Sequence, residues 1–597
     1  RIWEYMIILE EHYTAQYFMR AIRLHKILII FLLVLVSAEG KQLSYTNPII
    51  SGSYPDPSIV RVGEDYYIVN SSFEYFPGLP IHHSRDLVNW ELIGYGLHRA
   101  DQCNGKMNLV DVQSDGGIHA PSIRHHNGTF YIITTNVYSH GPEKQTEMIN
   151  FIITSDNIEG PWSEPHIIEG APGIDPDIIF DDDGTVWYVG THSPSKPNFN
   201  GEGEIWLQQL DLSTWSLTGE RYFLWRGALF YGTWAEGPHI YKKNGYYYLI
   251  IAEGGTGLNH AVMVAVSADI RGPYVPNARN PILTSRHLSN DYWVNSVGHG
   301  DLVQTKEGKW YMVALGIRSE FETYSNMGRE THLVPVIWEK EKFPWKYNQI
   351  DKNWGLLPSK EYFEKLRQVN YEWPVCSPVT GKVEKEYHIP MKGRPQRTKY
   401  RFIDYFGKDE LDLEWNFRRV PRAGTYEINT SERYLRLYCN ENIIKNRERC
   451  SLLGIRQKET EFTFLAKMRF NPILDGVDAG ISLFQKENNY LTFTVEYRNE
   501  KHFLKLILKE EKLDPVVLKQ IPIENYNGNI TLKMVSDDDS FRIYYAAGKK
   551  KTFTLFHSIG SDKLLSKGYT GAYLGLYCTS NGKKARAYAD FDKVEYY

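Results

Sequence analysis

Three acidic residues stand at matching points of a sequence pattern that recurs along the first part of the chain. Asp56 and Asp175 each open an Asp-Pro step before an apolar run, and Glu236 stands just before Gly-Pro and a third such run. Carboxylates that are brought together repel one another, so a fold tolerates them mainly where chemistry or a cation rewards the arrangement. One ionised and one protonated carboxyl can cleave a glycosidic bond, the first by activating water and the second by protonating the leaving oxygen.

Each acid, taken singly, also has a purely structural interpretation. Aspartate before proline commonly forms a turn, which would account for Asp56 and Asp175. Glu236 is harder to explain in this way, because it enters an apolar strand, where a charge without a purpose is costly. Four further aspartates lie in a turn, and we expect them to be solvated: Asp177, Asp181, Asp182 and Asp183.

The recurring pattern predicts the elements that would position these acids. It consists of an apolar strand, a turn containing glycine and an aromatic-rich strand, which together are typical of a β-hairpin. A unit of about 60 residues with roughly four short strands is typical of a propeller blade, and five units predict a five-bladed β-propeller. Because the innermost strands start around one axis, acids from blades one, three and four should converge there. The five first positions are Asp56, Ala120, Asp175, Gly237 and Gly300, with Glu236 and His299 one residue earlier in blades four and five.

The remaining chain predicts a second domain. Residues 374–400 are rich in proline, glycine and charge and read as a linker. Residues 401–597 contain short alternating strands without the blade pattern, which favours an antiparallel β-sandwich. The expected fold is therefore all-β, with a five-bladed β-propeller over residues 41–373 followed by a concanavalin-like antiparallel β-sandwich.

The first 40 residues contain a predicted signal for secretion and are not expected to be part of the folded domains. After Met19, a basic stretch precedes the apolar run Ile27–Val36 and then Ser37-Ala38, which is the order of a secretory signal peptide. Ten apolar residues are far short of the roughly 20 that span a bilayer. We expect cleavage near Ala38, residues before Met19 to be spurious, and a secreted protein with no membrane attachment after cleavage.

Composition excludes several function classes. The formal net charge is −4 in 597 residues, so there is no basic excess that would favour nucleic acid. Five cysteines without a paired motif leave at least one unpaired, and the lack of clustered cysteine or histidine argues against a zinc site.

Long stretches of the chain resemble glycoside hydrolase family 43. They are SYPDPSIVRVGEDYYIVNSSFEYFPGLPIHHSRDLVNW, PGIDPDIIFDDDG, EGPHIYKKNGYYYLIIAEGGT and MGRETHLVPVIWE. Within that family the chain is similar to the β-xylosidase/α-L-arabinofuranosidase members that carry a C-terminal sandwich, and the resemblance covers about residues 44–597. It implies an inverting, exo-acting hydrolase in which Asp56 is the general base, Asp175 tunes and orients, and Glu236 is the general acid.

The resemblance also implies weaker assignments. Phe73 would lie against the terminal sugar, although core packing explains it equally well, and Arg318 would lie near the sugar and the carboxylates. His299 would lie near the propeller axis, where some relatives hold calcium or a water cluster, although it could equally be a core histidine. His119 stands where many relatives have a bulkier aromatic residue. Asp592, in the last strand, is a candidate ligand for structural calcium, and a sandwich loop of unassigned residues would close the pocket.

These patterns together predict an enzyme that removes terminal xylose from xylo-oligosaccharides or xylan of plant cell walls and requires no redox cofactor. An α-L-arabinofuranosidase is the nearest alternative, because terminal xylose and arabinofuranose present similar hydroxyl patterns. A non-catalytic carbohydrate-binding propeller and a scaffold of the WD type are alternatives from other classes. The acids argue against the first of these, and the signal peptide and missing WD signature argue against the second.

Overall fold

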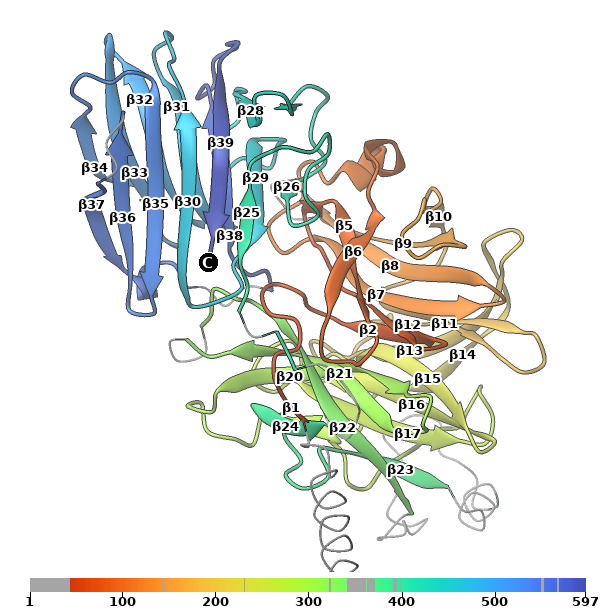
Figure 1. The fold of residues 1–597 in the computed structure, drawn as a ribbon. Coiled ribbons are helices and arrows are strands. Elements are labelled where there is room, and N and C mark those ends of the chain that lie inside the picture. The colour runs from red at the N-terminus through yellow and green to blue at the C-terminus, as the bar shows by residue number, and fades with distance from the viewer. Residues whose placement is uncertain are drawn as a thin grey trace, which may run out of the picture. The chain divides into compact units, whose positions relative to one another are not determined.

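The computed structural model describes residues 43–597, apart from 142, 144, 230, 321–323, 341–360, 362–370, 390–394, 398, 549–551 and 566–568. The predicted signal peptide lies outside the described residues. Within them, no helix is long and apolar enough to cross a membrane. The structure is almost entirely β, and the fold class expected from the sequence is confirmed: a five-bladed propeller and a C-terminal concanavalin-like sandwich (Figure 1).

Five antiparallel sheets form the blades, each built from strands that follow one another along the chain. Blade one contains β2 (Ser58–Val62), β3 (Asp65–Val69), β5 (Gly78–Ser84) and β6 (Glu91–Leu97). Blade two contains β7 (Gly117–His126), β8 (Thr129–His140), β9 (Gln145–Ser155) and β10 (His166–Ile167). Blade three contains β11 (Ile174–Phe180), β12 (Val186–His192), β13 (Glu204–Asp211) and β14 (Ser216–Trp225). Blade four contains β15 (Glu236–Lys243), β16 (Tyr246–Glu253), β17 (Ala261–Ser267), β18 (Val275–Pro276) and β19 (Leu283–Thr284). Blade five contains β20 (Val294–Gln304), β21 (Trp310–Arg318), β22 (Glu330–Lys340) and β23 (Glu372–Cys376).

One backbone feature repeats at the start of the innermost strand of every blade. The residue there has a positive φ in all five blades, between 41° and 57°. In blades two to five the pairing of the first hairpin shifts register around this residue, as a β-bulge does. A bulge re-aims side chains, so the repeat turns the same position of each blade toward the same end of the propeller. The five residues are Asp56, Ala120, Asp175, Gly237 and His299.

The positive-φ residue is the predicted first position of the repeat in blades one to four, but not in blade five. We expected Gly300 at the first position of blade five, with His299 one residue earlier. The positive φ of 49° belongs to His299, which therefore occupies the position of Asp56 and Asp175. Blade four has a Gly-Pro step at this position and blade five does not, so the sequence pattern placed the first position of blade five one residue too far along the chain.

A second layer of polar residues lies two positions further along the innermost strands. The guanidinium of Arg124 binds Asp177 and Asp301, with 3.2 Å between its Nη1 and Asp301 Oδ2. Asp301 Oδ2 also accepts from Ser58 Oγ at 2.7 Å, which joins blade one to blade five. Asp177 is fully buried, so the expectation that it is solvated was wrong. It belongs to the inner strand rather than to the following turn, and a cation from the neighbouring blade compensates its charge.

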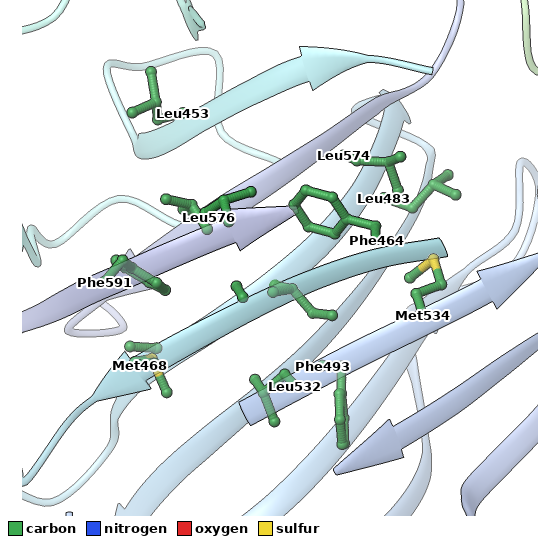
Figure 2. Packing of buried hydrophobic residues seen from close by; sticks show 14 of the residues in the cluster. Leu453, Phe464, Met468, Leu483, Phe493, Leu532, Met534, Leu574, Leu576 and Phe591 are labelled. Atoms are coloured by element: carbon green, nitrogen blue, oxygen red, sulfur yellow. The ribbon is translucent and has the colours of Figure 1, made fainter. Parts of the chain in front are cut away.

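The C-terminal domain consists of two stacked sheets. One contains β25 (Phe402–Asp404), β27 (Tyr426–Asn429), β28 (Tyr434–Tyr438), β30 (Glu461–Arg469), β35 (Asn529–Asp537), β36 (Ser540–Ala547), β37 (Thr554–Gly560) and β39 (Tyr588–Tyr596). The other contains β26 (Asn416–Arg418), β29 (Ser451–Arg456), β31 (Val477–Lys486), β32 (Asn489–Arg498), β33 (Lys501–Lys509), β34 (Val516–Pro522) and β38 (Tyr573–Thr579). Alternate residues point inward and form one apolar core, in which Phe464 and Met534 of one sheet and Leu483 and Phe493 of the other are all fully buried (Figure 2).

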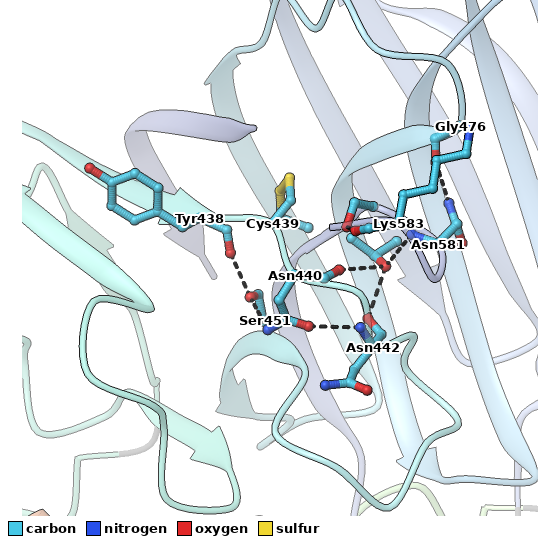
Figure 3. Close-up of a disulfide and its surroundings, with 11 residues drawn as sticks. Tyr438, Cys439, Asn440, Asn442, Ser451, Gly476, Asn581 and Lys583 are labelled. Atoms are coloured by element: carbon cyan, nitrogen blue, oxygen red, sulfur yellow. Dashed lines mark hydrogen bonds between the residues drawn. A yellow bond between two sulfur atoms is a disulfide. The ribbon is translucent and has the colours of Figure 1, made fainter. Parts of the chain in front are cut away.

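Two features tie this domain together and to the propeller. A disulfide joins Cys439, just after β28, to Cys578 in β38, surrounded by hydrogen-bonded side chains such as Asn440 and Ser451 (Figure 3). The short strand β4 (Tyr75–Phe76), which comes from blade one, pairs with β26 at the edge of the second sandwich sheet. The three remaining cysteines are buried and free: Cys103, Cys376 and Cys450.

Strands extend into the segment that was predicted to be a linker. The last propeller strand, β23, ends at Cys376, three residues beyond the expected limit, because its pairing with β22 continues through the first proline of the predicted linker. Part of that linker forms the strand β24 (Glu386–Ile389), which pairs with β1 (Leu43–Thr46) in a separate small unit.

Candidate active site

A cavity of about 410 Å³ opens among the blades at the positions the repeat predicts. Asp56, Asp175 and Glu236 all line it, although they come from blades one, three and four. The cavity therefore brings together the three acids that the sequence singled out. Other side chains in its wall come from blades two, four and five and from the sandwich: His119, Trp234, His260, His299, Arg329 and Tyr569.

Asp56 is surrounded by groups that favour its charged form. Its side chain is buried, and Oδ2 accepts a hydrogen bond from Ser71 Oγ at 2.6 Å. Arg329 Nη1 lies 3.5 Å from Oδ1, and His299 Nδ1 lies 4.0 Å from it. Burial acts to raise the pKa of Asp56, but His299, Arg329 and the Ser71 hydroxyl together hold it below its ordinary value. Asp56 is therefore the ionised carboxylate of the site.

Asp175 is held against the backbone beside Glu236. Its Oδ2 accepts a hydrogen bond from Gly237 N at 3.0 Å. Gly237 has φ +57°, and a Cβ there would lie 3.0 Å from the His299 ring, so glycine avoids both a strained backbone and a tight contact at this position. Burial, followed by the charge of Asp56, raises the pKa of Asp175 to about 7. The contact fixes the chain at the residue that follows Glu236.

Glu236 is the first residue of β15 and is partly buried at the cavity wall. The carbonyl of Ala235, the preceding residue, accepts a hydrogen bond from Thr191 Oγ1 at 2.5 Å, which anchors the strand start to blade three. Burial first, and then the charges of Asp175 and Asp56, raise the pKa of Glu236 well above its ordinary value, against the opposing effect of Arg329. Glu236 is thus the carboxyl that keeps its proton.

The arginine at the site is Arg329, whereas we expected Arg318. Arg318 is not among the residues that line the cavity, and its guanidinium binds the buried Glu330, with 2.8 Å between Nη2 and Oε1. Arg329 binds Asp56 and lies with its guanidinium carbon 4.4 Å from the ring centre of Tyr569. The two arginines flank the same end of the β21–β22 hairpin, where Gly316 pairs with Glu330. Arg318 ends β21 and Arg329 directly precedes β22, so the two arginines are close to the same hairpin end, but only Arg329 is among the cavity residues.

Aromatic residues surround the deep end of the cavity. His119 lines it, and its ring meets that of Phe73 edge-on at 4.8 Å. Phe73 itself is 1% exposed and lies behind this wall, so its position agrees with the core-packing alternative. Tyr569 comes from the loop before β38 and supplies the sandwich residue that sequence alone did not assign. Its neighbour Thr570 donates from Oγ1 to Asp115 Oδ1 at 3.1 Å.

The two residues considered as metal ligands, His299 and Asp592, have different surroundings. Among the described residues, no three histidine, cysteine or acidic side chains are grouped so that they could hold an ion. His299 Nδ1 lies 4.0 Å from Asp56 Oδ1, and burial lowers the pKa of the imidazole to about 4. Asp592 is bound by two cations, with 2.9 Å to Lys467 Nζ and 2.8 Å to Arg469 Nε. Calcium at Asp592 would have to compete with both side chains, so the donor set does not fit the ion.

Several cavity residues were not expected from the sequence, among them Arg329, His260 and Tyr569. Arg329 stands in the segment MGRETHLVPVIWE, which was noted for its resemblance and not for its arginine. His260, 1% exposed, points its Nδ1 at Ser296 O at 3.0 Å, and a lone histidine in the sequence carries no such signal. Tyr569 belongs to the second domain, and no pattern in a single sequence relates it to the propeller axis.

Comparisons with known proteins agree with this fold. Residues 45–344 match the model of glycosyl hydrolases family 43, and residues 403–597 match that of the beta xylosidase C-terminal concanavalin A-like domain. A xylosidase/arabinosidase of Butyrivibrio fibrisolvens is 36% identical over 91% of this chain and 98% of its own. A non-reducing end alpha-L-arabinofuranosidase of Bacteroides ovatus is 32% identical over 96% of this chain and 98% of its own.

The solved structures give the same result. The crystal structure of xylan beta-1,4-xylosidase from Bacillus halodurans aligns with a TM-score of 0.80 at 28% identity, over 92% of this chain and 99% of that one. The fold and the acid-lined cavity define a propeller enzyme that hydrolyses glycosidic bonds. The chain belongs to glycosyl hydrolases family 43.

Proposed function

We propose that this chain removes terminal xylose units from xylo-oligosaccharides, with inversion at the anomeric carbon. The observation that carries the proposal is that Asp56 and Glu236 share one cavity and have pKa values shifted in opposite directions. An inverting hydrolase needs this pair, one carboxyl ionised and one protonated at the same pH. The names of the relatives from Butyrivibrio fibrisolvens and Bacillus halodurans support xylose as the sugar.

In the proposed reaction Asp56 takes a proton from a water molecule as the water oxygen bonds to the anomeric carbon. The bond from that carbon to the glycosidic oxygen breaks, and Glu236 gives its proton to the oxygen that leaves. Asp56 ends protonated and Glu236 ionised, and both exchange protons with solvent before the next turnover. Asp175 positions the strand start through Gly237 N, and its charge helps Glu236 keep its proton. These steps need no redox cofactor.

The second candidate is an α-L-arabinofuranosidase, which the name of the Bacteroides ovatus relative favours. Both sugars would meet the same carboxyl pair, so the chemistry does not separate them. Initial rates on 4-nitrophenyl β-D-xylopyranoside and 4-nitrophenyl α-L-arabinofuranoside decide between the two. We expect the xyloside to be faster, and a dominant arabinofuranoside rate would favour the second candidate.

Two variants test the roles of the acids. Asp56→Ala should lose activity on every substrate, by at least about 100-fold, because no base activates water. Glu236→Ala should lose activity on xylobiose by a similar factor and far less on the 4-nitrophenyl glycoside, whose leaving group departs without protonation. The assignment fails if Asp56→Ala keeps wild-type activity or if Glu236→Ala affects both substrates equally. Release of the α-anomer of xylose, followed by proton NMR, tests inversion.

We also propose that the protein is secreted. The apolar run Ile27–Val36 after a basic stretch, followed by Ser37-Ala38, supports this. N-terminal sequencing of protein recovered from the culture medium should find a start near Lys41 or just before it. Retention of the whole activity in the cell pellet would contradict secretion.

A further inference from the structure

The segment between β14 and β15 carries two exposed aromatic side chains, one of which lines the cavity. Trp234 lines the cavity, yet 44% of the residue is exposed, and Tyr231 in the same segment is 62% exposed. Asp56 and Asp175, by contrast, are only 4% and 7% exposed. Exposure therefore increases from the two aspartates outward to Trp234, which stands two residues before Glu236 in the chain.

The indole of Trp234 is held in place by backbone on two sides. Trp234 N donates to Gly201 O at 2.6 Å. A Cβ on Gly201 would lie 3.1 Å from the indole, and one on Gly255 would lie 2.9 Å from it. Glycine at these two positions lets the main chain support the ring closely without covering it. The ring is thus fixed before any ligand arrives, which reduces the entropy lost on binding.

A buried carboxyl anchors the rest of the segment. Glu253, fully buried at the end of β16, accepts hydrogen bonds at Oε2 from Ala228 N at 2.6 Å and Leu229 N at 3.4 Å. A Cβ on Gly227 or Gly232 would lie only 2.3 or 2.8 Å from this carboxyl group, so both sides of the segment approach it closely. The segment that carries Tyr231 and Trp234 is therefore wrapped around Glu253.

We propose that Trp234 is a stacking platform for the sugar unit on the leaving-group side of the scissile bond, with Tyr231 extending the same rim. The proposal rests on the proposed function, because Glu236 must reach the oxygen that joins the terminal sugar to the next one. The terminal sugar occupies the buried end beside Asp56, so the next sugar must lie on the exposed side, where Trp234 is. The apolar face of a pyranose ring packs well on an indole, and an exposed, rigid aromatic at a cavity rim fits that ligand.

Isothermal titration of a Glu236→Gln protein, which should bind without turnover, tests the platform. Trp234→Ala in this background should weaken xylotriose binding by roughly 3- to 10-fold and leave the affinity for D-xylose, which fills only the terminal pocket, unchanged. Trp234→Phe should recover most of the loss. Tyr231→Ala should weaken xylotriose binding to a lesser extent. Tyr405→Ala, which removes a 49% exposed tyrosine of the sandwich, is the matched control and should have no effect.

Equal losses for xylotriose and D-xylose, or no loss for either, would overturn the platform. A circular dichroism melt of each variant shows whether a loss comes from misfolding, and the phenylalanine variant then carries the test. Turnover of xylotriose by the unmodified protein is scored separately. If that protein turns over xylotriose and Trp234→Ala has no selective effect, the platform alone fails. If it does not turn over xylotriose but Trp234→Ala weakens binding selectively, the proposed function fails, and Trp234 is then a platform for a bound oligosaccharide and not for a leaving group.

Discussion

The neighbours of Asp56 and Glu236, which line the same cavity, shift the pKa values of the two carboxyls in opposite directions. Asp56 has a guanidinium, an imidazole and a hydroxyl within 4.0 Å, and these outweigh the cost of burying its charge. Glu236 has burial and two other carboxyls acting in one direction. The protein's own residues therefore already favour the difference in protonation that hydrolysis needs.

The pH dependence of the reaction should show this difference directly. Activity falls at low pH as Asp56 binds a proton, and at high pH as Glu236 loses one. Ordinary values of 3.8 for aspartate and 4.5 for glutamate would leave almost no plateau between the limbs. Because one pKa is lowered and the other raised, we expect a broad plateau in kcat/KM for xylobiose. In Glu236→Gln, the residual rate on the 4-nitrophenyl glycoside should lose the alkaline limb, and persistence of that limb would assign it to another group.

Arg329 should control the acid limb. Replacing it by methionine removes the cation beside Asp56, so the pKa of Asp56 rises and the acid limb should move up by about one pH unit or more. Arg329→Lys should move it less. Arg318→Met is the matched control, since Arg318 pairs with Glu330 and not with Asp56. It should lower stability by roughly 3 kcal/mol and leave the limb in place, so a similar shift in both variants would contradict the role of Arg329.

At this scale the sequence predicted the acids better than their partners. Asp56, Asp175 and Glu236 could be found because each lies at or next to the same position of the repeat. Equivalent positions of a propeller's innermost strands lie around one axis, so the repeat also predicts that the three acids are close together. Arg329 and Tyr569 have no such phase, since one lies at a hairpin end and the other in a different domain. Asp177 was misjudged because burial of its charge depends on Arg124, a residue of another blade.

The segment between β14 and β15 depends on one buried side chain, Glu253. Burial raises the pKa of this carboxyl to about 7, against the two N–H groups that bind it. Glu253→Ala leaves the Ala228 and Leu229 N–H groups without their acceptor, which should cost about 1–3 kcal/mol in the stability of the segment. Hydrogen exchange at these two amides should speed up accordingly. Glu253→Gln keeps an acceptor oxygen and should show a smaller change, and unchanged exchange in both variants would contradict the anchoring role.

The starts of the innermost strands could not be predicted from the alternation of apolar and polar residues. The hairpins of all five blades were predicted from alternating apolar residues and their turns, and they are present. The bulge near the start of the innermost strand in blades two to five leaves no such trace, because it is a property of the pairing between strands. For that reason blade five was placed one residue late, at Gly300 instead of His299.

The disulfide of the sandwich should contribute to the stability of the whole molecule. Cys439 and Cys578 are 139 residues apart, and closing a loop of that length restricts the unfolded chain by up to about 4–5 kcal/mol. Cys439→Ser should lower the denaturation midpoint of the sandwich by a corresponding amount. Reductant should lower the wild-type midpoint and leave that of the variant unchanged. A variant with the wild-type midpoint would show that the bond adds nothing.

The strand β4 has a consequence for how the molecule is made. Asn416 of β26 binds Pro77 O, just after β4, across a separation of 339 residues. At about 5–20 residues per second, a ribosome needs roughly 20–70 seconds to add the part of the chain between them. Blade one can form during that interval, because β4 is not one of its paired strands. The propeller can therefore be folded before the sandwich strand that pairs with β4 has been synthesised. The second sheet of the sandwich therefore gains its edge strand from a domain synthesised before it, and transplanting the sandwich alone into another protein would leave that edge unpaired.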